Sequence, residues 1–75
     1  MIECEVPLSM KILVNGSDRE VAKACSIADL LRELQIDQKY VAVERNLKLV
    51  CREEHATEQL AEGDRLEVVT LVGGG

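Results

Sequence analysis

The hydrophobic positions along the chain predict short elements separated by turn residues. Residues 10–14 read Met-Lys-Ile-Leu-Val, an apolar run with the length of a β-strand. The dipeptide Asn15-Gly16 that follows is a strong hairpin signal. We expect residues 20–24 to form the return strand, after a loop over residues 15–19 that can hold more than two residues.

An amphipathic helix is expected next, with Ser26 as its N-cap. Ser26 and Asp29 have the spacing of a capping box, and Cys25 and Leu30 have that of a hydrophobic staple. Apolar residues then recur at the spacing of one helical face, at Ile27, Leu30, Leu31 and Leu34. A helix with such a face must lie on an apolar surface.

The second half of the chain predicts three further strands, each an apolar run bounded by turn residues. They are expected at residues 40–43, 47–50 and 66–72. The polar stretch 52–60 has Leu60 as its one apolar anchor, and residues 62–64 have the composition of a turn.

The order of these elements predicts an α+β fold. One helix packed on a mixed sheet of four to five strands gives two layers, in the β-grasp (ubiquitin-like) arrangement. The connection through the helix makes the first and last strands central, parallel neighbours. We expect residues 1–9 to be an N-terminal extension, 10–72 the β-grasp domain and 73–75 a flexible glycine tail.

Length and charge narrow the range of functions. A chain of 75 residues has a thin core, so we expect neither a pocket for a complex active site nor an enzyme. The net charge of −5 argues against nucleic acid and fits a basic protein partner better. No segment approaches the length of a membrane span, and the N-terminus does not read as a signal peptide, so we expect a cytoplasmic protein without a membrane partner.

The residues that commonly carry chemistry form no motif here. Cys4, Cys25 and Cys51 match no Cys-x-x-Cys spacing, so we expect buried or incidental thiols and no metal site. The single histidine, His55, is expected to be structural or solvated. Residues 52–54 read Arg-Glu-Glu and are expected to form a solvated charged face.

The C-terminal Gly73-Gly74-Gly75 directly follows the last expected strand. One interpretation is an ordinary frayed terminus. The other is an extended arm without side chains, which reaches about 10 Å and can enter a channel too narrow for a Cβ atom. The reactive group would then be the α-carboxylate of Gly75. Because it is ionised at neutral pH and a poor electrophile, it would need activation, most simply as an acyl-adenylate made from ATP.

Several segments together carry a family resemblance. They are Met-Lys-Ile-Leu-Val-Asn-Gly at 10–16, Val-Ala-Val-Glu-Arg-Asn at 41–46, Val-Cys-Arg-Glu-Glu-His at 50–55, Gly-Asp-Arg-Leu-Glu-Val-Val at 63–69, and Val-Gly-Gly-Gly at 72–75. In this set and order the chain resembles the ThiS family of sulfur carrier proteins of thiamin biosynthesis. It departs from the family at Cys51, where Pro is usual, and in the extension 1–9.

The resemblance implies a function located at the C-terminus. A ThiF-like adenylyltransferase would adenylate Gly75 with ATP, a persulfide donor would supply sulfur to form a thiocarboxylate, and a ThiG-like thiazole synthase would accept it. Val72, Gly73 and Gly74 would form the partner-binding tail, and the chain itself would need no cofactor. The alternatives are a MoaD-like sulfur carrier for molybdopterin synthesis and a passive β-grasp interaction module. A redox carrier is a third, which the cysteine spacing disfavours.

Overall fold

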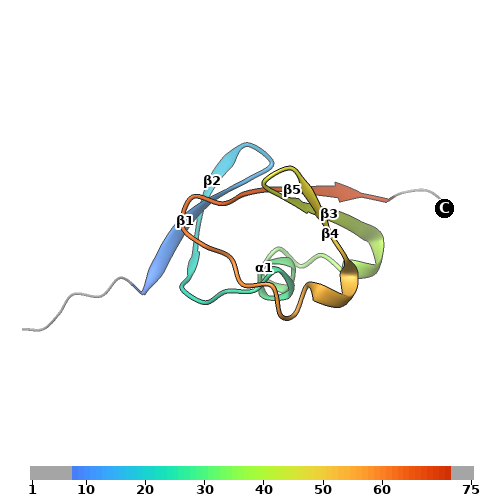
Figure 1. The fold of residues 1–75 in the computed structure, drawn as a ribbon, viewed down its shortest axis with the longest axis horizontal. Helices are drawn as coiled ribbons and strands as arrows, with labels where there is room; N and C mark the ends of the chain where they lie inside the picture. The colour runs from blue at the N-terminus through green and yellow to red at the C-terminus, as the bar shows by residue number, and fades with distance from the viewer. Residues whose placement is uncertain (1–7, 72–75) are drawn as a thin grey trace, which may run out of the picture.

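A five-stranded sheet with one helix packed on one of its faces forms the part of the chain that the computed structural model describes, residues 8–71 (Figure 1). The elements are β1 (Ser9–Val14), β2 (Ser17–Ala22), α1 (Ile27–Glu33), β3 (Val41–Arg45), β4 (Lys48–Val50) and β5 (Arg65–Thr70). Two short 3-10 helices lie at Gln38–Tyr40 and Arg52–Glu54. The predicted α+β architecture is confirmed, while the domain limits 1–9, 10–72 and 73–75 stay predictions.

The strand order in the sheet is β2-β1-β5-β3-β4. β1 and β5 are parallel, and the β1–β2, β3–β4 and β3–β5 pairs are antiparallel. The first and last strands are therefore parallel neighbours inside the sheet, as predicted. This order gives β5 a strand on each side, so the strand that leads to the C-terminus is also the central one.

The β1–β2 hairpin is tighter than the sequence suggested. Asn15 and Gly16 both have positive φ, 52° and 85°, the geometry of the two-residue turn that suits the twist of paired strands. Pairing therefore starts at once, with Val14 opposite Ser17. The predicted loop over 15–19 is wrong, because the polar residues that follow the turn are already part of β2.

The predicted end of this hairpin is also wrong. Ala24 has a φ of 69° and lies beyond β2, which stops at Ala22. A left-handed residue cannot continue a strand, so the chain turns here toward Ser26 and the helix.

The start of α1 is as predicted. The Ser26 hydroxyl accepts a hydrogen bond from the Asp29 backbone N–H, and the Asp29 carboxylate accepts one from the Ser26 backbone N–H, each at 3.1 Å. The bond from the Ser26 backbone is the main reason that the pKa of Asp29 lies below its usual value. The capping box therefore fixes where the helix begins.

The core lies between α1 and the face of the sheet that the helix covers (Figure 1). Ile27, Leu30 and Leu31 of the predicted helical face are buried, and Leu34, at the C-cap, is partly buried. The rest of the buried apolar set is Met10, Ile12, Val21, Cys25, Val41, Val43, Val50, Leu60 and Leu66. The burial of Cys25 and Leu30 agrees with the predicted staple, and that of Leu60 with its role as an anchor.

All three strands on the C-terminal side differ from their predicted limits. β3 extends to Arg45, β4 begins at Lys48 and β5 begins at Arg65. β3 begins at Val41, because Tyr40 belongs to the 3-10 helix that precedes it. β5 ends at Thr70, whose partner is Val41, although the apolar run continues to Leu71. The last strand therefore ends opposite the residue where its antiparallel neighbour β3 begins, and Val72 lies outside the described residues.

Because Leu30 and Leu31 are 0% and 2% exposed, we expect Leu30→Ala and Leu31→Ala each to lower the free energy of unfolding by about 2–5 kcal/mol. Urea denaturation followed by circular dichroism measures this change. Leu47→Ala is a matched control, since Leu47 lies in the β3–β4 turn and is 79% exposed. Midpoints near that of the parent for both helix variants would contradict the burial of this face.

Candidate functional site

The residues predicted to carry the chemistry, Val72, Gly73, Gly74 and Gly75, lie outside the described residues. Their roles stay predictions. What the structure describes is the strand that leads to them and the surface around its end.

The end of β5 is held by backbone hydrogen bonds up to Leu71, the last described residue. Thr70 pairs with Val41, and the Leu71 N–H donates to the Tyr40 carbonyl at 2.6 Å. Since β5 runs parallel to β1 and starts opposite its end, it points away from the start of β1 (Figure 1). The position and direction in which the chain leaves the sheet at Leu71 are thus fixed.

Asparagine side chains pair with β5 where its neighbours turn away. The β1–β5 ladder covers only Leu13–Arg65 and Val14–Leu66. Beyond it, the Asn15 amide accepts from the Val68 N–H at 2.8 Å and donates to the Val68 carbonyl at 3.3 Å. The Asn15 side chain thus forms the hydrogen bonds to Val68 that the backbone of another β1 residue would otherwise form.

Asn46 likewise forms hydrogen bonds to the backbone of β5, at the start of that strand. Its backbone N–H donates to the Arg65 carbonyl at 2.8 Å, and its side-chain oxygen accepts from the Arg65 N–H at 2.9 Å. Both Asn15 and Asn46 have a φ of 52°, which asparagine tolerates better than most residues. Each turn residue therefore serves its own hairpin and β5 at once.

A buried ionic network lies at the start of β5. The Asp64 carboxylate accepts from Arg45 Nε at 2.8 Å, Asn46 Nδ2 at 3.1 Å and the Ala61 N–H at 2.8 Å. Arg45 Nη1 also donates to Glu58 at 2.8 Å. Burial alone would lower the pKa of Arg45, but its bonds to Glu58 and Asp64 raise it. The network is structural, and Arg45, Asn46 and Asp64 stand in segments that carry the family resemblance.

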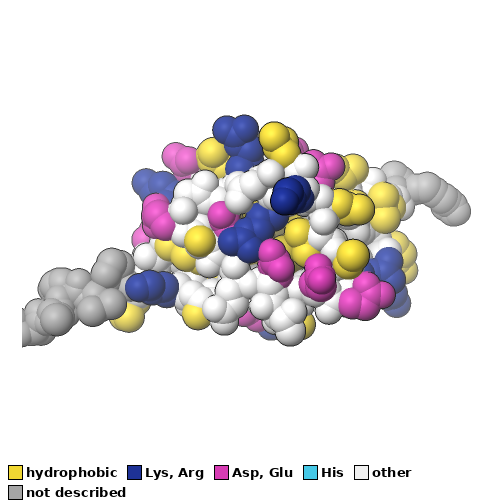
Figure 2. All heavy atoms as spheres, in the orientation of Figure 1, with side chains coloured by type: hydrophobic (Ala, Val, Ile, Leu, Met, Phe, Trp, Pro, Cys, Tyr) yellow, Lys and Arg dark blue, Asp and Glu magenta, His cyan; other side chains and the backbone are white. Residues whose placement is uncertain are grey.

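The face of the sheet away from α1 carries apolar side chains near the end of β5. Val69 lies opposite Ala42, and Leu49 lies opposite Glu44, on the side of the strands opposite to buried Val43 and Val50. Leu49 is 67% exposed, and Val69 and Leu71 are about half exposed. We call Tyr40, Ala42, Leu49, Val69 and Leu71 the open face. Figure 2 shows hydrophobic side chains gathered on the surface around the end of β5.

Two carboxylates border the open face. Glu44 of β3 and Glu67 of β5 are directly opposite each other in the antiparallel ladder. Each is partly buried, and neither forms an ion pair or side-chain hydrogen bond with residues in the range 8–71. Like charges in this position destabilise a sheet. The sequence alone did not reveal this pair, because finding it requires the register of two strands that lie 20 residues apart.

His55 and the two described cysteines, Cys25 and Cys51, are not among the residues of the open face. His55 is 2% exposed, and its Nδ1 lies 3.1 Å from Gln38 Oε1. Of the two roles expected for this histidine, structural or solvated, the structural one is therefore correct. Burial, with the charges of Asp29 and Glu33, raises the pKa of the Cys25 thiol. Cys51 is an exposed free thiol and Cys4 lies outside the described residues. The exposed residues 52–54 match the predicted charged face.

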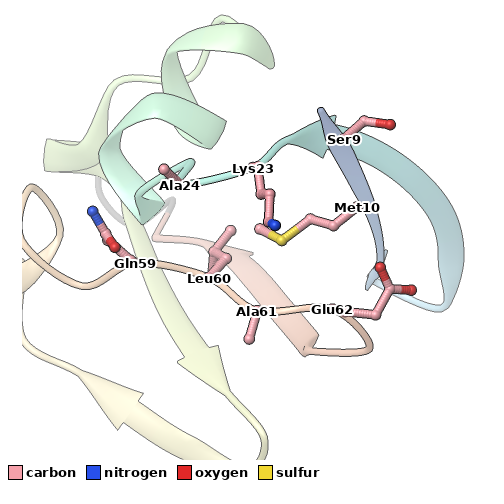
Figure 3. A pocket seen from close by; sticks show the side chains of 8 residues that line it. All are labelled: Ser9, Met10, Lys23, Ala24, Gln59, Leu60, Ala61 and Glu62. Atoms are coloured by element: carbon pink, nitrogen blue, oxygen red, sulfur yellow. The ribbon is translucent and has the colours of Figure 1, made fainter. Parts of the chain in front are cut away.

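A cavity of about 610 Å³, open to solvent, lies beside the start of β1 (Figure 3). Met10 and Leu60 point into it, and Ser9, Lys23, Ala24, Gln59, Ala61 and Glu62 complete its lining. Its volume is within the range of ligand sites, so the expectation that no such pocket exists is wrong. Its one carboxylate, Glu62, accepts the Lys11 N–H at 3.1 Å, so the lining offers no free acid–base pair.

Residues 8–71 contain neither a metal-binding cluster nor a membrane-spanning helix. No group of three or more His, Cys, Asp or Glu side chains is arranged to hold a metal ion. In the same range, the one α-helix is too short and too polar to cross a membrane.

The sheet order and the single helix define a small ubiquitin-like domain of the β-grasp class whose central strand leads to a glycine C-terminus. The chain belongs to the ThiS family, whose model matches residues 12–75. The sulfur carrier protein ThiS of Bacillus subtilis is 38% identical over 63 residues, which cover 83% of this chain and 96% of that protein. The crystal structure of the thiamine biosynthesis protein ThiS from Geobacter metallireducens superposes with a TM-score of 0.76 at 33% identity. That match covers 88% of this chain and 100% of the other.

A longer protein contains a similar stretch. The thiazole synthase of Paramagnetospirillum magneticum is 41% identical over 66 residues, 88% of this chain. The aligned stretch spans only about a fifth, 20%, of the length of that thiazole synthase.

Since Asp64 is buried and accepts three hydrogen bonds, we expect Asp64→Ala to lower the free energy of unfolding by about 3 kcal/mol. The change leaves the Arg45 guanidinium without its closest partner and frees the Ala61 N–H. Thermal unfolding by circular dichroism measures the loss. Glu53→Ala, at an exposed position, is expected to unfold within a few degrees of the parent. Equal midpoints for both variants would refute the role of the network.

Proposed function

We propose that this chain is a sulfur carrier for thiamin biosynthesis whose C-terminal glycine is converted to a thiocarboxylate. The observation that supports this best is that the family match runs through to residue 75 and so includes the glycine terminus. The name of the Bacillus subtilis relative, a sulfur carrier protein, supports the same function.

The proposed chemistry begins at the α-carboxylate of Gly75. A carboxylate oxygen attacks the α-phosphorus of ATP, an oxygen–phosphorus bond forms, and pyrophosphate leaves. The resulting acyl-adenylate is an electrophile, which the free carboxylate is not. The terminal sulfur of a donor persulfide then attacks the carbonyl carbon, AMP leaves, and an acyl disulfide forms. A second thiol of the sulfur donor attacks the other sulfur of that disulfide, so the S–S bond breaks, the thiocarboxylate leaves, and the two donor thiols end as a disulfide.

The proposed partners are a ThiF-like adenylyltransferase and a thiazole synthase. The occurrence of a similar stretch within chains named thiazole synthase supports the second partner. In this proposal the chain catalyses nothing itself, because the ATP site and the sulfur donor belong to the partners. We infer a cytoplasmic location, where ATP is available and thiols stay reduced.

The tail is tested by deleting Gly74 and Gly75. The deletion shortens the reach by about 7 Å, so the new carboxylate should stop short of the ATP site of the partner. Gly74→Val adds a β-branched side chain that restricts the backbone and widens the arm. We expect both variants to bind the adenylyltransferase and to give no ATP–pyrophosphate exchange.

Circular dichroism melts are the control for folding, because neither change touches residues 8–71. Intact mass spectrometry of the parent, from cells that express the partners, should show oxygen replaced by sulfur at the C-terminus. If the folded, truncated protein is adenylated as fast as the parent, Gly75 is not the reacting residue.

The cysteines are tested by replacing Cys4, Cys25 and Cys51 together with Ala. We expect thiocarboxylate formation to continue, because the sulfur is bound to the carbonyl carbon of Gly75. Stability should fall by about 1–3 kcal/mol, since Cys25 is 6% exposed and packs in the core. Intact mass measures the first effect and urea denaturation the second. A folded variant that no longer accepts sulfur would identify a thiol as the carrier.

A further inference from the structure

We propose that the carboxylate of Gly75 binds within its own chain, in a hollow between α1 and the two 3-10 helices, and is released from it before it reacts. This inference rests on the proposed function and deepens it, because it names a regulation of the reacting group. Three observations support it: the side chains that line the hollow, its distance from the end of β5, and the length and charge of the residues that follow Leu71.

The hollow has a volume of about 370 Å³ and is lined from three helical segments. Arg32 belongs to α1, Gln38 to the first 3-10 helix and Arg52 to the second. Four apolar side chains, Leu31 and Ile36 among them, complete the lining. We call this hollow the arginine pocket.

The charged side chains of the arginine pocket are all cationic. Arg32 and Arg52 line it, and no Asp or Glu does. By contrast, the cavity of about 610 Å³ includes Glu62, and a second hollow of about 370 Å³ includes Glu54 and Glu58. In a chain with a net charge of −5, a pocket with two guanidinium groups and no carboxylate favours an anionic ligand.

Both arginines have donors for such a ligand. Arg32 Nη1 donates to Asp29 at 3.1 Å, but both side chains of this ion pair are at least half exposed, and an exposed pair contributes little. A guanidinium has five N–H donors, so Arg32 can bind a second carboxylate beside the first. Arg52 forms no ion pair among residues 8–71.

The buried His55 fixes the third polar group of the pocket. His55 Nδ1 lies 3.1 Å from Gln38 Oε1, and because that oxygen can only accept, Nδ1 carries the proton and donates it. His55 is the C-cap of the second 3-10 helix, so this bond joins the two 3-10 helices that form the walls. The Gln38 side-chain N–H2 group is then left to donate to a ligand.

The arginine pocket lies at the end of the domain from which the C-terminus leaves (Figure 1). The Leu71 N–H donates to the Tyr40 carbonyl at 2.6 Å, and Tyr40 and Gln38 belong to the same 3-10 helix. Paired backbones lie about 5 Å apart and a 3-10 helix rises about 2 Å per residue, so Gln38 is about 10 Å from Leu71. The four residues after Leu71 span up to about 14 Å, so the carboxylate of Gly75 can reach the pocket.

The composition of these four residues suits the arginine pocket. Gly73, Gly74 and Gly75 have no side chains, so the chain can bend sharply beside Tyr40 and enter a small hollow. The one charge of this segment is the carboxylate at its end, which matches the two arginines in sign. Guanidinium groups bind carboxylates through paired hydrogen bonds.

Binding in the arginine pocket regulates the proposed reaction. While the carboxylate is bound there, it cannot attack ATP, so the adenylyltransferase acts only on molecules whose terminus is released. The KM for the carrier is then higher than it would be without the pocket, by the inverse of the released fraction.

The first experiment compares ¹⁵N–¹H NMR spectra of the chain with those of the same chain ending in an uncharged amide, in a buffer without phosphate or sulfate. We expect the backbone signals of Ala28 and Ala56, which line the pocket, to differ between the two forms, and the difference to shrink at high salt. In Arg32→Gln combined with Arg52→Gln, the two forms should give the same signals at these positions.

A matched control is Lys48→Gln combined with Arg65→Gln. It removes the same number of positive charges at exposed positions near the start of β5, outside the arginine pocket. We expect this control to keep the difference between the carboxylate and amide forms.

The second experiment measures ATP–pyrophosphate exchange by the purified adenylyltransferase of the same organism at increasing carrier concentration. For Arg32→Gln combined with Arg52→Gln we expect KM for the carrier to fall about threefold with kcat unchanged, because exposed ion pairs of modest strength no longer hold the terminus. The control variant should leave KM unchanged. A purely structural role for the arginines predicts the opposite direction, because damage to the fold lowers activity.

Identical spectra for the carboxylate and amide forms overturn the inference, and so does a KM that is unchanged or higher in the Arg32 and Arg52 variant. A spectral difference that disappears on dilution also overturns it, because the occupant would then be the terminus of a second copy. The proposed function fails separately. In that case the parent gives no exchange, or the protein lacking Gly74 and Gly75 gives as much as the parent, whatever the spectra show.

Discussion

Backbone hydrogen bonding along both edges of β5 is the constraint on which the rest of the structure depends. β5 pairs with β3 over five residues, but with β1 over only two. The Asn15 and Asn46 side chains complete the pairing, and Asp64 holds the turn before the strand. Because a central strand cannot shift without breaking both ladders, the exit of the chain at Leu71 is fixed by the whole sheet.

Two groups of charged side chains near β5 differ in whether they have hydrogen-bond partners within the described chain. Around Asp64 each buried carboxylate oxygen has a donor, and such a network stabilises only because it is fully satisfied. Glu44 and Glu67 face each other without a donor, although a Thr or Lys at either position would favour the sheet. Departures from local preference of this kind are expected where a surface serves a function rather than the fold.

Signals between neighbouring residues were predictable from the sequence, and so was the parallel pairing of β1 with β5, but side-chain contacts between distant residues were not. The capping box at Ser26 and Asp29 and the Asn15-Gly16 turn depend on neighbouring residues, so α1 and the first hairpin were found. The end of β5 was misplaced because it is set by the start of the antiparallel β3, not by its own apolar run. The contact of Arg45 with Asp64 joins residues 19 apart, and no pattern in the chain marks it.

The candidate site likewise has one part that the sequence revealed and one part that it did not. The tail at Gly73–Gly75 was identified from composition and resemblance, whereas the open face needed the register of three strands. The two parts are linked by Leu71, whose N–H is the last backbone group that the sheet holds, through Tyr40. Only four residues follow it, so the terminus stays within about 14 Å of the open face. A short tether keeps the effective concentration of the terminus at a docked active site high, and each added residue would lower it. A thin core suffices for the proposed function, because the domain has to hold one surface and one exit point while the proposed reacting group, the carboxylate of Gly75, lies beyond the sheet.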